Sequence, residues 1–176
     1  IWDSLVREND LQTGEMVALG FDGSKSSDCT ALIVSRIKDG RWFPLKIWDP
    51  AQYPDHQVPR AEVDQFMSLA FGAYDVKYLF ADPPYWEHEL GVWSGRWPEK
   101  VVRFDTNSDK RMDQAISRFL AALKSGLTHA GDSVLTDHVR SAALAKGQHR
   151  RPRPEEDQNA DLRFQRVVKK RQTGHI

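Results

Sequence analysis

The pattern of apolar and polar positions predicts three consecutive strands near the start of the chain. Apolar residues dominate segments 16–22, 30–37 and 42–48, and the second of these is rich in β-branched residues. Between the second and third segments stands Asp39-Gly40, a dipeptide typical of tight hairpin turns. We therefore expect an antiparallel three-stranded meander.

The rest of the chain predicts alternating helices and strands. Apolar residues recur at helical spacing over 59–73, 86–93, 108–124 and 132–144. Short apolar or alternating runs predict strands at 76–81, 101–104 and 162–171. A meander followed by βα units predicts an α/β fold, with a mixed β-sheet of antiparallel and parallel strands flanked by helices. This order matches the ribonuclease H-like architecture, in which the first strand lies centrally, beside and parallel to the fourth.

Length and composition fit one globular domain of 176 residues, with 147–172 as a basic loop or hairpin appendage. Cys29 is the only cysteine, so an intrachain disulfide is excluded. No apolar run approaches the roughly 20 residues that a membrane span needs, and we expect no membrane partner. The chain begins without Met and stops at Ile176, which favours a fragment of a longer protein.

The polar tip after the first predicted strand, Asp22-Gly23-Ser24-Lys25, admits three interpretations. It is a plain hairpin turn, a phosphate-binding loop or a metal-binding acid at a strand end. The P-loop pattern is disfavoured because Gly and Lys are not adjacent and a strand follows instead of a helix. A phosphate hairpin of the sugar-kinase kind needs a second lobe that this chain cannot accommodate. The turn and the metal-binding acid stay open.

A second aspartate favours metal binding. Asp82 also ends a predicted strand, directly before Pro83-Pro84. If the two strands are parallel neighbours, about 4.8 Å apart, both carboxylates lie at one edge of the sheet. Their mutual repulsion is relieved by a divalent cation, and Mg²⁺ or Mn²⁺ suits oxygen ligands. Two such cations roughly 4 Å apart catalyse phosphodiester cleavage in many nucleases.

Six stretches occur in a distinctive order: GFDGS at 20–24, DCTAL at 28–32, ADPPYW at 81–86, LTHAGD at 127–132, DHVRSA at 137–142 and KKRQTGHI at 169–176. Together they resemble the C-terminal nuclease domain of the large terminase subunit of tailed bacteriophages. The resemblance implies a metal-dependent endonuclease with two Mg²⁺ or Mn²⁺ ions that cuts concatemeric double-stranded viral DNA during genome packaging. It also implies a preceding ATPase domain, the small terminase subunit and the portal as partners, and action in the host cytoplasm, transiently at the procapsid portal.

Carried over to this sequence, the resemblance makes Asp22 and Asp82 the first two metal-binding, catalytic acids. The family's third acid directly follows a Lys/His-Ile pair, which places it just after Ile176. Asp28, His138 and His175 are auxiliary candidates near the site. Each of these three also has a plain interpretation as a turn, structural or solvated residue.

Basic residues are the candidate DNA contacts. Between 146 and 171 there are nine Lys or Arg against four Asp or Glu, an excess of five positive charges. Phosphate neutralisation by such a segment does not depend on DNA sequence. The predicted contacts are Lys25, Arg150, Arg151, Arg153, Arg166, Lys169, Lys170 and Arg171. The alternative is a solvated loop that binds nothing.

Three tryptophans, Trp86, Trp93 and Trp97, follow Asp82. Core packing is the simpler interpretation, and a platform for DNA or for the ATPase domain is the other. Two further hypotheses about the function of the chain stay open beside the terminase nuclease. One is another nuclease of the same fold, such as a Holliday-junction resolvase or a transposase. The other is a non-catalytic module that docks on DNA or the portal.

Overall fold

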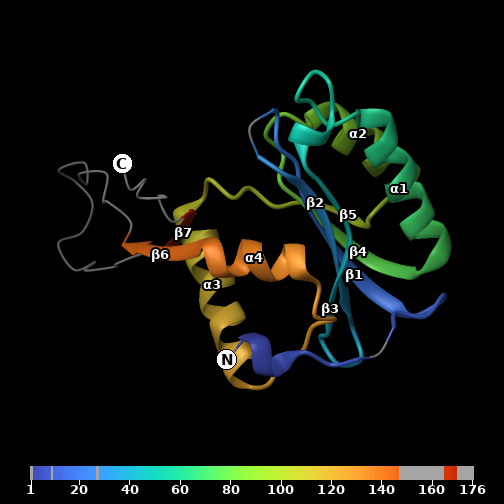
Figure 1. Ribbon diagram of the computed structural model, residues 1–176. Coiled ribbons are helices and arrows are strands. Elements are labelled where there is room, and N and C mark those ends of the chain that lie inside the picture. Colours follow the sequence, from blue (N-terminus) through green and yellow to red (C-terminus); the bar gives the residue numbers. More distant parts are fainter. Residues whose placement is uncertain (1, 9, 27, 147–164, 170–176) are drawn as a thin grey trace, which may run out of the picture.

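The computed structural model describes residues 2–8, 10–26, 28–146 and 165–169. At its centre is a five-stranded sheet in the order β3-β2-β1-β4-β5 (Figure 1). The strands are β1 (Met16–Asp22), β2 (Thr30–Arg36), β3 (Trp42–Trp48), β4 (Asp75–Ala81) and β5 (Val101–Arg103). β1 pairs antiparallel with β2 and parallel with β4. The predicted mixed sheet, with the first strand beside and parallel to the fourth, is confirmed.

Four α-helices flank the sheet: α1 (Arg60–Ala73), α2 (Glu87–Arg96), α3 (Asp109–Lys124) and α4 (Ser133–Ser141). α1 and α2 lie on one side of the sheet, and α3 and α4 lie on the other (Figure 1). Two short 3₁₀ helices, η1 (Trp2–Leu5) and η2 (Pro50–Gln52), complete the regular structure before α1. Within the part of the chain described, no helix is long and apolar enough to cross a membrane.

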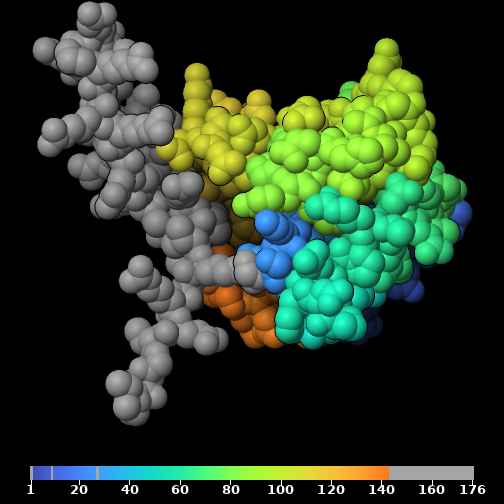
Figure 2. All heavy atoms as spheres, turned by 90° about the horizontal axis from the view of Figure 1, so that it is seen from above, coloured from blue at the N-terminus to red at the C-terminus, as the bar shows by residue number. Residues whose placement is uncertain are grey.

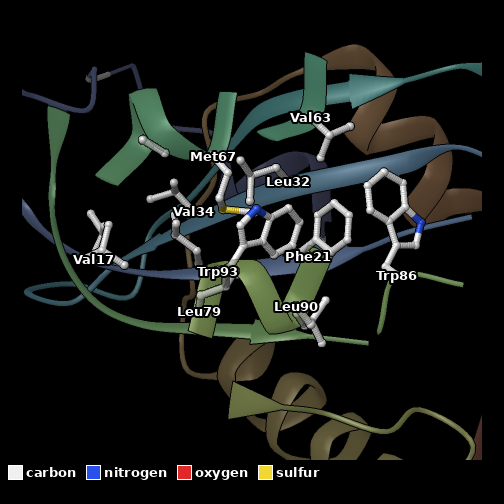
Figure 3. Packing of buried hydrophobic residues seen from close by; sticks show 14 of the residues in the cluster. Val17, Phe21, Leu32, Val34, Val63, Met67, Leu79, Trp86, Leu90 and Trp93 are labelled. Atoms are coloured by element: carbon white, nitrogen blue, oxygen red, sulfur yellow. The ribbon is translucent and has the colours of Figure 1, made fainter. Parts of the chain in front are cut away.

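The main hydrophobic core lies between the sheet and helices α1 and α2 (Figure 3). Alternate residues of β1 point into it, and Leu19 and Phe21 are both buried. Trp86 and Trp93 are also buried there, each in an edge-to-face contact with Phe21. Trp97 stacks on Phe71 with ring centroids 3.7 Å apart. All three tryptophans are therefore packing residues, as the simpler interpretation expected.

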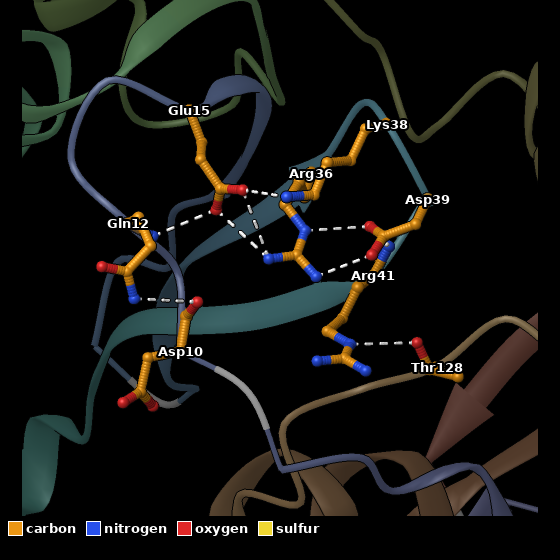
Figure 4. Close-up of polar contacts among 8 residues, drawn as sticks. All are labelled: Asp10, Gln12, Glu15, Arg36, Lys38, Asp39, Arg41 and Thr128. Atoms are coloured by element: carbon orange, nitrogen blue, oxygen red, sulfur yellow. Dashed lines mark hydrogen bonds and ion pairs between the residues drawn. The ribbon is translucent and has the colours of Figure 1, made fainter.

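The end of the sheet at which β1 begins is held by a cluster of charged side chains around Arg36 (Figure 4). The buried Arg36 guanidinium pairs with Asp39 at 2.6 Å and with Glu15 at 3.2 Å. The pKa of Glu15 is lowered to about 2, mainly by a hydrogen bond from Lys38 and next by one from the Gln12 backbone N–H. The hydrogen bonds from Arg36 lower the pKa of Asp39 to about 2. Both carboxylates therefore stabilise the fold in their charged form.

One segment differs from the predictions. The helix predicted to reach Leu144 ends at Ser141, because Ala142 turns to extended backbone and begins β6 (Ala142–Lys146). β6 pairs antiparallel with β7 (Gln165–Lys169), which lies inside the strand predicted at 162–171. The intervening residues of the predicted basic appendage lie outside the described part of the chain. The helix predicted at 132–144 is confirmed over 133–141 and wrong over 142–144, where strand pairing with a distant segment overrides local helical periodicity.

Candidate active site at the ends of strands β1 and β4

The two aspartates singled out from the sequence lie next to each other at one edge of the sheet. Asp22 is the last residue of β1, and Asp82 directly follows β4. Phe21 stands opposite Ala81 in the parallel register, and the Asp82 backbone N–H donates to the Phe21 carbonyl at 3.1 Å. Their parallel strands thus bring both carboxyl groups to the carboxyl edge of the sheet, where α/β proteins place their sites. Their role as metal ligands stays a prediction.

The carboxylate of Asp82 is oriented by the segment that follows β5. Its Oδ1 accepts a hydrogen bond from the Thr106 backbone N–H at 3.2 Å, and its Oδ2 accepts one from the Thr106 hydroxyl. Thr106 is held close because the Phe104 backbone N–H donates to the Ala81 carbonyl at 2.8 Å. Thr106 was not among the residues predicted from the sequence. The available signal was its position after a third parallel strand, whose end reaches the same edge.

Both aspartates line two adjoining hollows. The polar hollow has a volume of about 290 Å³, and its other lining residues are Gly23, Ser24, Asp28, Cys29, Pro84, Tyr85 and Asn107. The apolar hollow, of about 500 Å³, lies on the face of the sheet opposite α1 and α2 and includes Trp42, Phe80 and Phe104. Figure 2 views the molecule from this end: the segment after β1, in blue, is exposed between the green region after β4 and the blue-green loop after β3.

The loops that carry the two aspartates are joined by Trp86. The Trp86 indole N–H donates to the Ser24 carbonyl at 3.3 Å. The ring also occupies the space beside Gly23, where an added Cβ would lie 2.3 Å from ring atoms. Because Gly23 follows Asp22 and Trp86 comes four residues after Asp82, this contact fixes one acidic loop against the other.

Asp28 lies in the same polar hollow, as its status as an auxiliary candidate requires. Its Oδ1 also accepts from the Cys29 backbone N–H at 2.9 Å, and its own backbone N–H donates to the Ser24 hydroxyl at 3.2 Å. The structure therefore supports the turn role of Asp28 and leaves a part in ligand binding open.

Other candidates are not brought to the hollow. His138 is exposed on α4 and does not line either hollow. Lys25 is exposed in the loop after β1. Arg166 and Lys169 belong to β7, of which only the backbone is described. The candidates outside the described residues are His175, Arg150, Arg151, Arg153, Lys170 and Arg171.

The donor atoms around the two aspartates suit a hard divalent cation. Besides the carboxylates, the oxygen-bearing residues Ser24 and Asn107 line the polar hollow. No group of three or more His, Cys, Asp or Glu side chains that could share an ion is found in the described ranges. Mg²⁺ is commonly bound through one or two carboxylates, with water and substrate phosphates completing its shell. Asp22 and Asp82 fit that mode of binding.

Sequence comparison finds relatives among phage proteins. The chain is 38% identical over 143 residues to the Gene 13 protein of Mycobacterium phage L5, and 37% identical over 143 residues to that of Mycobacterium phage D29. Each alignment covers 75% of this chain and 24% of the relative, so the chain spans about a quarter of the length of these proteins. No protein-family model matches the sequence.

Comparison of structures finds large terminases of phages. The HK97 bacteriophage large terminase superposes with a TM-score of 0.68 at 18% identity, over 93% of this chain and 37% of that one. The large terminase nuclease from thermophilic phage G20c gives 0.63 at 14% identity, over 93% and 78%. Structures of the G20c nuclease contain magnesium or zinc. The chain has the ribonuclease H-like fold of these nucleases.

Proposed function

We propose that this chain is the nuclease domain of a phage large terminase and cuts double-stranded DNA with the help of divalent cations. The observation that carries the proposal is the pair Asp22 and Asp82, brought to one edge of the sheet by parallel strands and facing a polar hollow. The fold shared with phage terminase nucleases and the relatedness to phage proteins support it.

In this proposal Asp22 and Asp82 hold Mg²⁺ or Mn²⁺, with two ions in the complete site. When bound, such cations stabilise negative charge on the phosphodiester and favour attack by water. Thr106 holds the Asp82 carboxylate in one orientation through two hydrogen bonds. Trp86 keeps the loop after Asp22 against the loop after Asp82. The polar hollow between them accommodates the phosphodiester.

Wider features of the proposal follow the resemblance to the family. The DNA is concatemeric viral DNA, and the basic segment at 147–172 and Lys25 contact its phosphates. An ATPase domain of the same protein, the small terminase subunit and the portal are the proposed partners. The proposed place of action is the host cytoplasm, transiently at the procapsid portal.

The test is nicking of supercoiled plasmid by the purified chain, with Mg²⁺ or Mn²⁺ and with EDTA. We expect cleavage only with the cation, and a loss of about 100-fold or more in Asp22→Asn and Asp82→Asn, which keep size but remove charge. Asp75→Asn is the matched control. Asp75 begins the same strand β4 at its opposite end, in an exposed ion pair with Lys77 at 2.8 Å.

Cleavage in EDTA, or full activity in both variants, would contradict the proposal. Metal-dependent, symmetric cutting confined to four-way junctions would indicate a resolvase instead. DNA binding without any cleavage would favour a docking module.

A further inference from the structure

Tyr85 stands out at the rim of the polar hollow. It is 60% exposed and lines the hollow together with Asp22 and Asp82. Among the described residues, its ring and hydroxyl take part in no hydrogen bond and no ring contact; only its backbone carbonyl is bonded. A large side chain is thus largely exposed to solvent beside the two acids.

The backbone at this position is held in an uncommon conformation. Tyr85 has a φ of +67°, a left-handed value that residues other than Gly seldom adopt. Pro83 and Pro84, directly before it, restrict the chain leading to this conformation. A glycine would adopt it without strain, so the turn itself does not require a tyrosine.

Arg60 braces this conformation from helix α1. Its Nη2 donates to the Tyr85 carbonyl at 2.7 Å, and its Nη1 pairs with Glu89 of α2 at 2.6 Å. The guanidinium also lies over the Trp86 ring, 4.4 Å from the centroid. The backbone segment that carries Tyr85 is therefore held by contacts from α1 and α2.

We propose that Tyr85 is a DNA-contacting residue whose phenol hydroxyl donates a hydrogen bond to a backbone phosphate beside the bond that is cut. This inference rests on the proposed nuclease function. Phosphate oxygens receive most protein–DNA hydrogen bonds, and tyrosine is among their donors. A phenol is uncharged at neutral pH, so it binds phosphate without competing, as Lys or Arg would, for the carboxylates that a cation needs.

The test measures DNA binding without cleavage. Fluorescence anisotropy of a labelled duplex is recorded with the full chain in EDTA for the wild type, Tyr85→Phe and Tyr85→Ala. We expect the dissociation constant to rise about 5- to 10-fold in Tyr85→Phe, as for loss of one exposed hydrogen bond to a charged group, and to rise no less in Tyr85→Ala. Tyr78→Phe is the matched control, because Tyr78 is 50% exposed on β4 and lines neither hollow.

Tyr85→Gly distinguishes the effect of the tyrosine side chain on DNA binding from its effect on stability. It removes the left-handed strain, so the melting temperature rises, whereas DNA binding weakens as in Tyr85→Ala. Wild-type affinity in Tyr85→Phe overturns the proposed hydroxyl contact, and wild-type affinity in Tyr85→Gly overturns any contact by this side chain. Because binding is read without cleavage, failure of the nuclease proposal and failure of this contact are distinguishable. If nicking depends on Asp22 but Tyr85→Phe changes neither affinity nor KM, only the inference on Tyr85 is lost.

Discussion

Replacing Gly23 by Ala tests whether close contact between the two acidic loops positions the site. The added Cβ would lie 2.3 Å from both Cδ1 and Nε1 of Trp86, whereas ordinary contacts begin at 3.4 Å. One of the two groups must therefore move by about 1 Å. The ring has little freedom, because Trp86 is 1% exposed and packs edge-to-face on Phe21 at 5.0 Å. The displacement is therefore expected to fall on the loop that follows Asp22.

The magnitude follows from the two interactions disturbed. Overpacking a buried contact costs about 1–3 kcal/mol, and losing the indole hydrogen bond to Ser24 costs about 0.5–1.5 kcal/mol. The total cost is about 1.5–4.5 kcal/mol. In a chain of this size each kcal/mol lowers the melting temperature by about 2–4 °C, so a decrease of about 3–18 °C is expected for Gly23→Ala. A shift of 1 Å in a catalytic group can lower a rate by about 100-fold. We therefore expect the rate of metal-dependent nicking to fall by about 10- to 100-fold.

The assay combines thermal unfolding, followed by circular dichroism, with plasmid nicking at a temperature where the variant stays folded. Gly91→Ala in α2 is the matched control, because its added Cβ meets nothing within 4 Å. Removing a glycine from a helix raises stability by about 0.5–1 kcal/mol. If Gly23→Ala matches the wild type in both stability and nicking, the contact with Trp86 does not position the acidic loops.

Four further predictions follow from the structure. The pKa of Glu15 is lowered from 4.5 to about 2, and that of Asp39 from 3.8 to about 2. Their contribution to stability is therefore complete above about pH 4.5 and is lost as the pH falls toward 2. A melting temperature that stays constant between about pH 4.5 and pH 2 would contradict this. Arg36→Met leaves the carboxylates of Glu15 and Asp39 without their buried partner. It should lower the free energy of unfolding, measured by urea denaturation, by about 1–3 kcal/mol and make that free energy depend less on pH; an unchanged urea midpoint would refute this. His129→Ala removes a ring stacked on Trp2 at 3.8 Å and a hydrogen bond to the Trp2 carbonyl at 3.0 Å, so hydrogen exchange should accelerate over residues 2–7 and not in β1. Thr106→Val removes the hydroxyl hydrogen bond to Asp82 Oδ2 and keeps the backbone hydrogen bond to Oδ1, so nicking should fall about 10-fold with a melting temperature within about 3 °C of the wild type; unchanged nicking would show that the carboxylate does not need the hydroxyl bond.

The sheet was predictable because its signals are local or follow general topology. Alternating burial along β1 and the Asp39-Gly40 turn are visible in short windows of sequence. The parallel pairing of β1 with β4 followed from the order of the elements, and this pairing brings Asp22 and Asp82 together. The β6–β7 pairing was not anticipated because its partners are about twenty residues apart and the helical pattern of α4 runs into β6.

The supports of the site could not be predicted in the same way. Thr106 reaches Asp82 from a different strand end, and Trp86 meets Gly23 only once β1 and β4 have paired. The left-handed backbone of Tyr85 depends on Arg60, which lies 25 residues away in the chain. These contacts form between side chains and backbone groups that are far apart in the sequence. Neither periodicity nor composition of a single sequence indicates such contacts.

Anomalous scattering from a crystal of this chain soaked in Mn²⁺ shows directly whether Asp22 and Asp82 share a cation. We expect a manganese peak within coordination distance of carboxylate oxygens of both Asp22 and Asp82, and no such peak in a crystal of Asp22→Asn soaked in the same way. Clear density for both side chains with no manganese between them, or an ion held equally well by the variant, would contradict the proposed metal-dependent nuclease site.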